Sequence, residues 1–127
     1  MSAALVSVLI VDDNVAMTRS LADILEVKGF VVHAANTGAD ALQILRDNPV
    51  DILLTDVKMP DMNGVSLYRQ TRTAHPALTT ILMTAYAADE LIQQGLSEGI
   101  KAVLTKPLDV DFLLQLFLAI KRNLPTK

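Results

Sequence analysis

Residues 8–14 read Val-Leu-Ile-Val-Asp-Asp-Asn, four apolar residues followed directly by two acids. A short apolar run bounded by polar residues is typical of a strand that is buried on both faces of a sheet. Asp12 and Asp13 stand where this strand is expected to end. The fold class then depends on how many similar runs follow and on what separates them.

Five such runs recur along the chain, and most of them carry β-branched residues, which favour strands. The runs are Leu5–Val11, Phe30–Ala35, Ile52–Thr55, Thr79–Thr84 and Ala102–Thr105. The segments between them have helical spacing. Strands that alternate with helices need crossover connections, which make the strands parallel and put helices on both faces. The pattern predicts an α/β fold of five βα units.

Caps and helix breakers set the expected helix boundaries. The first helix carries Met17, Leu21, Ile24 and Leu25 at helical spacing and stops at Gly29. Later helices are expected at 37–47, from Asn63-Gly64 to His75-Pro76, from Asp89 to Gly99, and from Asp109 to about Asn123.

The composition limits the size and the function of the protein. The 127 residues are enough for one domain, 51% are hydrophobic and only 4% aromatic, and the formal net charge is −3. The absence of cysteine excludes disulfides, thiol catalysis and cysteine-bound metals. The sequence has no membrane span, no signal peptide and no run of basic residues. We therefore expect a single cytoplasmic domain over residues 1–127 that binds neither membrane nor nucleic acid directly.

Polar residues stand at the ends of four of the five runs. In a parallel sheet every strand ends at the same edge, so these residues are expected to converge. They are Asp12 and Asp13 after the first run, Asp56 after the third, Thr84 at the end of the fourth and Lys106 after the fifth. The second run ends at Ala35-Asn36, where no such residue is apparent.

Three carboxylates at one edge raise one another's pKa, and Lys106 offsets only one unit of charge. Oxygen ligands suit Mg²⁺, which commonly bridges carboxylates to a phosphoryl group. In such a pocket a carboxylate can act as nucleophile and form an aspartyl phosphate. Asp56 is the better candidate nucleophile, because Asp12 and Asp13 form a pair suited to holding the metal.

Each of these residues also has an ordinary structural interpretation when it is taken alone. Asp12-Asp13 suits a helix cap, Asp56 a turn and Lys106 a solvated loop. Their joint occurrence at successive strand ends favours the functional interpretation.

Four segments of the chain resemble the receiver domains of two-component response regulators, the CheY-like family. The segments are 8–14, 55–64, Met83-Thr84-Ala85 and Thr105-Lys106-Pro107. The resemblance extends from the first strand to the last helix. It implies a flavodoxin-like, doubly wound sheet of five parallel strands in the order 2-1-3-4-5.

The resemblance implies that Asp56 is the phosphoacceptor. Mg²⁺ would be bound by Asp13, Asp56 and the backbone carbonyl of Lys58, and Asp12 would assist through a bound water. The donor would be a phosphohistidine on a sensor histidine kinase or phosphotransfer protein, with small acyl phosphates as substitutes. Such a phosphorelay domain catalyses its own phosphorylation and slow dephosphorylation rather than a metabolic reaction.

The resemblance also implies the contacts of the phosphoryl oxygens. Thr84, Lys106 and the backbone N–H groups of Lys58 and Ala85 would make them, and a cis peptide before Pro107 would aim the Lys106 amine. In the family the Thr hydroxyl and an aromatic residue on the last strand then move together, which switches a partner-binding surface.

Val103 stands where many receivers have Tyr or Phe, so the coupled aromatic movement has no ring to use here. Tyr86 lies two residues after Thr84, and Lys58 lies two residues after Asp56. We expect this pair to tune the access of water to the aspartyl phosphate.

The last helix has more apolar residues than one face needs. We expect an inward stripe of Phe112, Leu113, Leu116, Phe117 and Ile120, which leaves Leu114 and Leu118 on other faces. A helix that is apolar on more than one face usually has a second neighbour. This predicts a partner surface here or on the Asp89–Glu98 helix, for a second copy or an adjoining output domain.

Three other functions are weaker. A degenerate receiver that acts without phosphorylation is favoured only by Val103. A phosphatase of the haloacid dehalogenase type needs a second Asp two residues after its nucleophile, where this chain has Lys58. A dinucleotide-binding domain needs a glycine-rich loop after the first strand, which is absent.

Overall fold

The computed structural model describes residues 5–86 and 89–124, over which strands and helices alternate. The first half of the chain contains β1 (Ser7–Val11), α1 (Val15–Val27), β2 (Val31–Ala35), α2 (Gly38–Asp47) and β3 (Ile52–Asp56). The second half contains α3 (Gly64–Thr71), β4 (Thr79–Thr84), α4 (Glu90–Glu98), β5 (Ala102–Thr105) and α5 (Val110–Arg122). The predicted succession of five βα units is confirmed.

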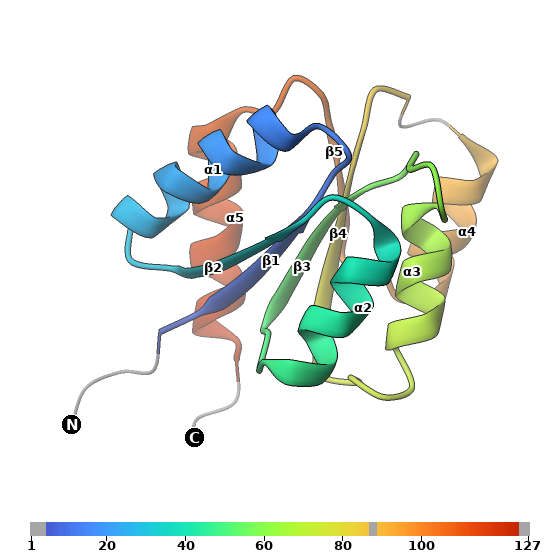
Figure 1. Cartoon of the computed structure of the whole chain (residues 1–127), viewed down its shortest axis with the longest axis horizontal. Helices are drawn as coiled ribbons and strands as arrows, with labels where there is room; N and C mark the ends of the chain where they lie inside the picture. Colours follow the sequence, from blue (N-terminus) through green and yellow to red (C-terminus); the bar gives the residue numbers. More distant parts are fainter. Residues whose placement is uncertain (1–4, 87–88, 125–127) are drawn as a thin grey trace.

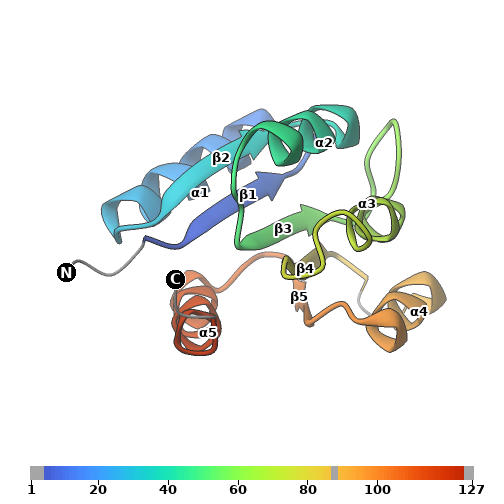
Figure 2. The same cartoon turned by 90° about the horizontal axis from the view of Figure 1, so that it is seen from below.

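The five strands form one parallel sheet in the order β2-β1-β3-β4-β5 (Figure 1). In the middle of the sheet Val8 lies opposite Val32 on one side and Ile52 on the other. Helices α1 and α5 cover one face, and α2, α3 and α4 cover the other (Figure 2). This is the flavodoxin-like, doubly wound architecture that the family resemblance implied.

β1 is buried along its whole length because it serves both cores. Val8 and Ile10 pack with α1 and α5, whereas Leu9 and Val11 pack with α2 and α3. The period of two along a strand sends successive side chains to opposite faces, so both faces require apolar residues here. This explains why the sequence shows a continuous apolar run before Asp12.

Each helix begins at a side chain that accepts a hydrogen bond from a backbone N–H in the first turn. These capping residues are Asn14, Thr37, Asn63, Asp89 and Asp109. Gly29 and Gly99, which have φ of 96° and 128°, end α1 and α4 in a backbone conformation that favours glycine. The expected helix starts at positions 37, 63, 89 and 109 are therefore confirmed.

Some expected boundaries were wrong at the ends of elements. Phe30 does not begin β2, because its N–H bonds to the carbonyl of Leu25 and so completes the C-terminal turn of α1. α3 ends at Thr71 rather than at His75-Pro76. β3 extends one residue further than expected, to Asp56, whose Cα pairs with that of Met83.

The expected inward stripe of α5 is wrong at Phe112, which is 53% exposed, and Leu114, expected on another face, is half-buried against the same core. The fully buried residues of the helix follow the spacing i, i+4, i+7 at Leu113, Phe117 and Ile120. Phe117 meets Phe30 edge to face, with the ring centroids 5.6 Å apart. This pair fills the space under α5, and Phe112 lies one residue outside the stripe.

The C-terminal ends of α3 and α4 are joined by a polar cluster around Glu98. Arg69 donates to both carboxylate oxygens of Glu98, over 2.9 and 2.6 Å, and Arg72 donates to one of them over 3.0 Å. The Tyr68 hydroxyl donates to the backbone carbonyl of Glu98 over 2.8 Å. The hydrogen bond from Arg69, followed by the charges of Arg69 and Arg72, holds the pKa of Glu98 below its ordinary value.

We predict that Glu98→Gln lowers the melting temperature at pH 7 by roughly 2–5 °C, because it removes the carboxylate that pairs with Arg69. A carboxyl group whose pKa is lowered in the folded state stabilises the protein above its unfolded pKa of about 4.3. That stabilisation is lost as the pH falls through the lower, folded-state pKa. The difference from the wild type should therefore shrink in thermal melts as the pH falls below about 4.3. Glu90→Gln, on the first turn of the same helix, is the matched control, and a difference that does not shrink as the pH falls would contradict the prediction.

Candidate functional site

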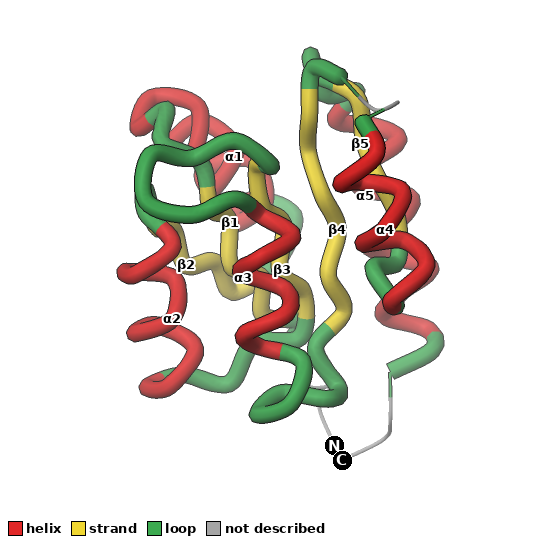
Figure 3. Tube along the Cα trace, turned by 90° about the vertical axis from the view of Figure 1, so that its right-hand side faces the viewer, coloured by secondary structure: helices red, strands yellow, loops and turns green. Residues whose placement is uncertain are grey.

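The predicted site residues meet at the carboxyl edge of the sheet, at the upper end in Figures 1 and 3. Asp56 and Thr84 are the last residues of β3 and β4. Asp12 and Asp13 follow β1, and Lys106 follows β5. One carboxylate oxygen from each of Asp12, Asp13 and Asp56 lies within 4.8 Å of the others. The parallel strands thus bring together residues that are up to 94 positions apart in the sequence.

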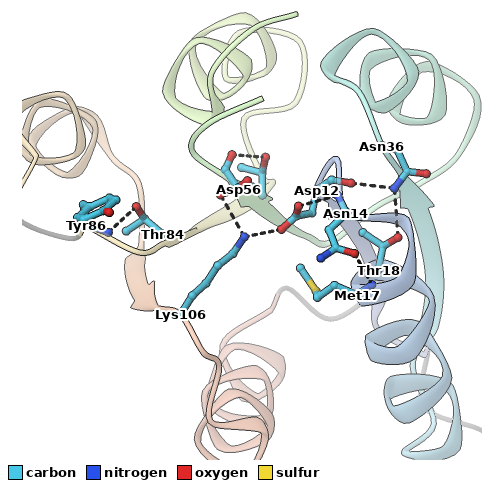
Figure 4. Close-up of polar contacts among 10 residues, drawn as sticks. Asp12, Asn14, Met17, Thr18, Asn36, Asp56, Thr84, Tyr86 and Lys106 are labelled. Carbon is cyan, nitrogen blue, oxygen red and sulfur yellow. Dashed lines mark hydrogen bonds and ion pairs between the residues drawn. The ribbon is translucent and has the colours of Figure 1, made fainter. Parts of the chain in front are cut away.

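Lys106 connects two of the three acids (Figure 4). Its Nζ donates to Asp12 Oδ2 over 2.6 Å and lies 3.4 Å from Asp56 Oδ1. Asp12 is 1% exposed and Asp56 9%. Burial raises the pKa of Asp56, and the charge of Asp12 raises it further, while Lys106 works in the opposite direction. Burial also disfavours the charged Lys106, but its hydrogen bond to Asp12 and the charge of Asp56 outweigh this and raise its pKa.

The three acids have unequal surroundings. Both carboxylate oxygens of Asp12 accept hydrogen bonds, Oδ2 from Lys106 and Oδ1 from the backbone N–H of Asn14 over 2.9 Å. Asp13 is exposed. Asp56 lies between them in exposure and faces Lys106. Asp12 is therefore fixed by its partners, whereas Asp13 is open to an incoming cation.

The donor set fits Mg²⁺, which prefers carboxylate and carbonyl oxygens in octahedral geometry. One carboxylate oxygen from each of the three acids already lies within 4.8 Å of the others. Asp13 and Asp56 could hold the ion directly. Asp12, whose two carboxylate oxygens already accept hydrogen bonds, could assist through a water.

Thr84 and Lys106 are linked through the backbone. The N–H of Lys106 donates to the carbonyl of Thr84 over 2.8 Å, and the peptide between Lys106 and Pro107 is cis. The hydroxyl oxygen of Thr84 accepts a hydrogen bond from the N–H of Tyr86 over 3.0 Å (Figure 4). The Thr84 hydroxyl proton remains available to another acceptor.

Lys58 and Tyr86 extend from the loops that follow the paired strands β3 and β4, and their side chains meet. The Lys58 Nζ lies 5.2 Å from the centre of the Tyr86 ring, within the range of a cation–π contact. Both side chains are exposed, as is Ala85 between Thr84 and Tyr86. Val103 is half-buried instead, against the apolar cluster that contains Leu82 and Ile92. The contact therefore links the loop after β3 to the loop after β4.

The loop that carries Lys58 is held at both ends. Gly64 donates its N–H to the carbonyl of Val57 over 2.8 Å, and a Cβ at Gly64 would collide with the backbone carbonyl of Asp56. The Asp61 carboxylate accepts hydrogen bonds from the N–H groups of Gly38 and Ala39 at the start of α2, over 3.1 and 3.0 Å. These bonds hold the pKa of Asp61 below its ordinary value. The position of the loop is thus set by β3 and α2 together.

One residue of the site region is missing from the sequence prediction. Asn36, the first residue after β2, donates through Nδ2 to the backbone carbonyl of Asp12 over 2.8 Å and to the Thr18 hydroxyl over 3.2 Å (Figure 4). Its position at a strand end was the only available signal, because a neutral amide carries no charge or nucleophile to attract attention. The second strand does contribute to the site edge after all.

A 2-1-3-4-5 parallel sheet with converging acids and a lysine at its carboxyl edge defines the class of receiver-type signalling domains. The model of the response regulator receiver domain family matches residues 8–118. The chain therefore belongs to the response regulator receiver domain family of two-component signalling.

Individual relatives agree with this assignment. A response regulator receiver protein of Anaeromyxobacter sp. (strain Fw109-5) is 40% identical over 108 residues, which are 85% of this chain and 45% of that protein. The sensor histidine kinase RcsC of Escherichia coli is 41% identical over 108 residues, 85% of this chain and 11% of the kinase. The chain thus spans less than half the length of these curated relatives.

A solved structure shows the same fold. The crystal structure of a CheY-like response regulator receiver domain protein from Methanospirillum hungatei is 31% identical, with a TM-score of 0.86. The match covers 94% of this chain and 96% of that one.

Within the described ranges, no helix is both long and apolar enough to cross a membrane.

Proposed function

We propose that residues 1–127 form a single receiver domain that accepts a phosphoryl group on Asp56 from a phosphohistidine of a sensor histidine kinase or phosphotransfer protein. The observation that carries this proposal is the convergence of three carboxylates within 4.8 Å, with Lys106 in contact with Asp12 and 3.4 Å from Asp56. The proposal retains the cytoplasmic location that was predicted from the sequence.

In the reaction a carboxylate oxygen of Asp56 attacks phosphorus, the new O–P bond forms, and the P–N bond to the donor histidine breaks. Lys106 is already held by Asp12, so its ammonium is in place to interact with the phosphoryl oxygens without reorganisation. Asp13, Asp56 and the Lys58 carbonyl would hold Mg²⁺, with Asp12 assisting through water, and the bound ion would supply further neutralisation of the phosphoryl charge. Hydrolysis of the acyl phosphate by water returns Asp56 to its starting state.

The remaining contacts come from the ends of β4 and β3. The Thr84 hydroxyl, which accepts from the Tyr86 N–H, can donate its proton to a phosphoryl oxygen. The backbone N–H groups of Ala85 and Lys58 complete the set in this proposal. Val103 packs against the cluster that contains Ile92 of α4 but has no ring. The movement of Thr84 would therefore reach α4 through Tyr86, whose carbonyl accepts a hydrogen bond from the N–H of Asp89 over 3.3 Å.

Phosphorylation-independent signalling is the second candidate, and it is not favoured. A degenerate receiver would be expected to lack part of the acidic cluster, the hydroxyl or the lysine. This chain has all of them at the carboxyl edge, and Asp12 and Lys106 form a direct ion pair. A metabolic phosphatase is disfavoured as well, because Lys58 stands where the second acid would be required.

We further propose that α4 and α5 carry the partner surface, and that its occupant is a second copy of the domain. Phe112 and Leu118 are exposed on α5, 53% and 48% respectively. α5 has Asp111 in its first turn, and Lys121 and Arg122 in its last. Two copies of the helix in antiparallel contact around a two-fold axis therefore bring opposite charges together.

The first prediction concerns phosphorylation itself. Incubation with acetyl phosphate and Mg²⁺ should add one phosphoryl group to the intact mass, and omission of Mg²⁺ should abolish the adduct. Asp56→Asn should remain unmodified, because an amide oxygen is a poor nucleophile. Mg²⁺ binding without any adduct in the wild type would instead favour the phosphorylation-independent module.

The second prediction concerns the lifetime of the aspartyl phosphate. Lys58→Ala and Tyr86→Ala should each shorten it a few-fold, because the cation–π pair limits the access of water to Asp56. Tyr86→Phe preserves the ring and should leave the lifetime unchanged. Loss of the phosphoryl group is followed by intact mass after removal of the donor, and unchanged lifetimes in both Ala variants would refute this role.

The third prediction concerns the partner surface. Leu118→Lys should reduce self-association of the phosphorylated domain, measured by sedimentation, at least tenfold. Val27→Lys introduces the same charge at an exposed site on α1 and serves as the control. Leu114→Lys is a less clean test, because Leu114 also packs against the core. If Leu118→Lys associates like the wild type, or if no dimer forms, the second copy is not the occupant.

A further inference from the structure

Asn36 continues the pairing between β1 and β2 beyond the point where the strands separate. The Cα register of the two strands ends with Val11 opposite Ala35. One more backbone hydrogen bond follows, from the Asp12 N–H to the Ala35 carbonyl over 3.2 Å. The Asp12 carbonyl then accepts from the side chain of Asn36 over 2.8 Å. The side-chain amide of Asn36 thus donates the hydrogen bond that a backbone N–H would donate if β2 were longer.

This bond is important because Asp12 is only 1% exposed. A buried carbonyl without a hydrogen-bond donor is unfavourable. If the Asn36 amide were removed, the backbone at Asp12 would therefore be expected to reorient toward another donor. The carbonyl belongs to the peptide group that joins Asp12 to Asp13. The orientation of that peptide sets the direction in which both acidic side chains leave the backbone.

The amide is itself held in place by α1. Asn36 Nδ2 also donates to the hydroxyl of Thr18 over 3.2 Å, and this hydroxyl donates to the Val15 carbonyl over 3.0 Å. Thr18 is buried inside the helix face that packs on the sheet. Asn36 therefore connects the turn after β1 to a rigid element, as Figure 4 shows.

We propose that Asn36 is a positioning residue for Mg²⁺ binding. It holds the Asp12–Asp13 peptide so that the carboxylates of Asp12 and Asp13 converge with that of Asp56. It acts through the Asp12 backbone and contacts neither the cation nor the phosphoryl group. The inference rests on the proposed function, because it assigns Asn36 to the Mg²⁺ site of the same reaction.

The test measures the affinity for Mg²⁺ alone, by titration of the ¹⁵N-labelled full chain followed by NMR, without a phosphodonor. Asn36→Ala and the nearly isosteric Asn36→Leu both remove the donor, and both should raise the Kd for Mg²⁺ about tenfold. Asn48→Ala is the matched control, because the Asn48 amide also donates to a backbone carbonyl, that of Ile44, over 3.1 Å at the end of α2. This control should leave the Kd unchanged.

A second measurement separates positioning from general destabilisation. The rate of phosphorylation by acetyl phosphate should require about tenfold more Mg²⁺ for half-saturation in the Asn36 variants. Saturating Mg²⁺ should restore most of the wild-type rate. A variant that is only less stable would instead lose amplitude at every Mg²⁺ concentration. Melting curves establish that both Asn36 variants are folded under the conditions of the measurement.

Several results would overturn the inference. A Kd for Mg²⁺ within twofold of the wild-type value in both Asn36 variants would contradict it. An increased Kd in Asn36→Ala but not in Asn36→Leu would also contradict it, because the loss of side-chain volume would then be responsible rather than the loss of the donor. A wild-type protein that binds Mg²⁺ but takes no phosphoryl group refutes the proposed function, while the Kd comparison still decides the role of Asn36. A wild-type protein that does not bind Mg²⁺ refutes both.

Discussion

Carboxylates repel one another, and this domain holds three of them with oxygens within 4.8 Å at one edge of its sheet. Two are largely buried, which raises the pKa of Asp56 and makes its charged form less favourable. Lys106 compensates for part of this charge through its bond to Asp12. Without the hydrogen bonds from the surrounding loops, repulsion between the three carboxylates would push them apart. A bound divalent cation would offset the remaining negative charge, together with the further negative charge that a phosphoryl group adds.

The supports of the site come from both layers of helices. On one side, Thr18 of α1 holds Asn36, which holds the Asp12 carbonyl. On the other, Asp61 ties the loop after β3 to the start of α2. The acids that follow β1 and the acid that ends β3 are therefore attached to separate helices on opposite faces of the sheet. Their mutual distance reflects the packing of the whole domain, which is why a small α/β fold can keep them at short range without a covalent link.

Much of this could be predicted from the sequence, because strongly periodic features decide it. The buried strand before Asp12 shows as an apolar run, and helix starts such as Asp109 follow from capping chemistry. The convergence of Asp12, Asp56 and Lys106 follows from parallel topology, whereas the strand order came from family resemblance. Phe112 was misplaced because Phe and Leu residues on neighbouring helix positions look alike in a hydrophobic pattern. Asn36 was missed because its effect depends on a hydrogen bond to a backbone carbonyl, which no residue pattern reveals.

The Glu98 cluster has a mechanical consequence for α4. Arg69, Arg72 and the Tyr68 hydroxyl all hold the C-terminal end of this helix. At the N-terminal end, the backbone N–H of the capping residue Asp89 donates to the carbonyl of Tyr86 over 3.3 Å. An anchored end acts as a pivot, and displacement along a rigid rod grows with distance from it. The nine residues of α4 span ~13 Å, so a rotation of ~10° about the anchored end moves the first turn by ~2 Å. A rotation about the Glu98 cluster would therefore move the first turn of α4 more than any other part of the helix.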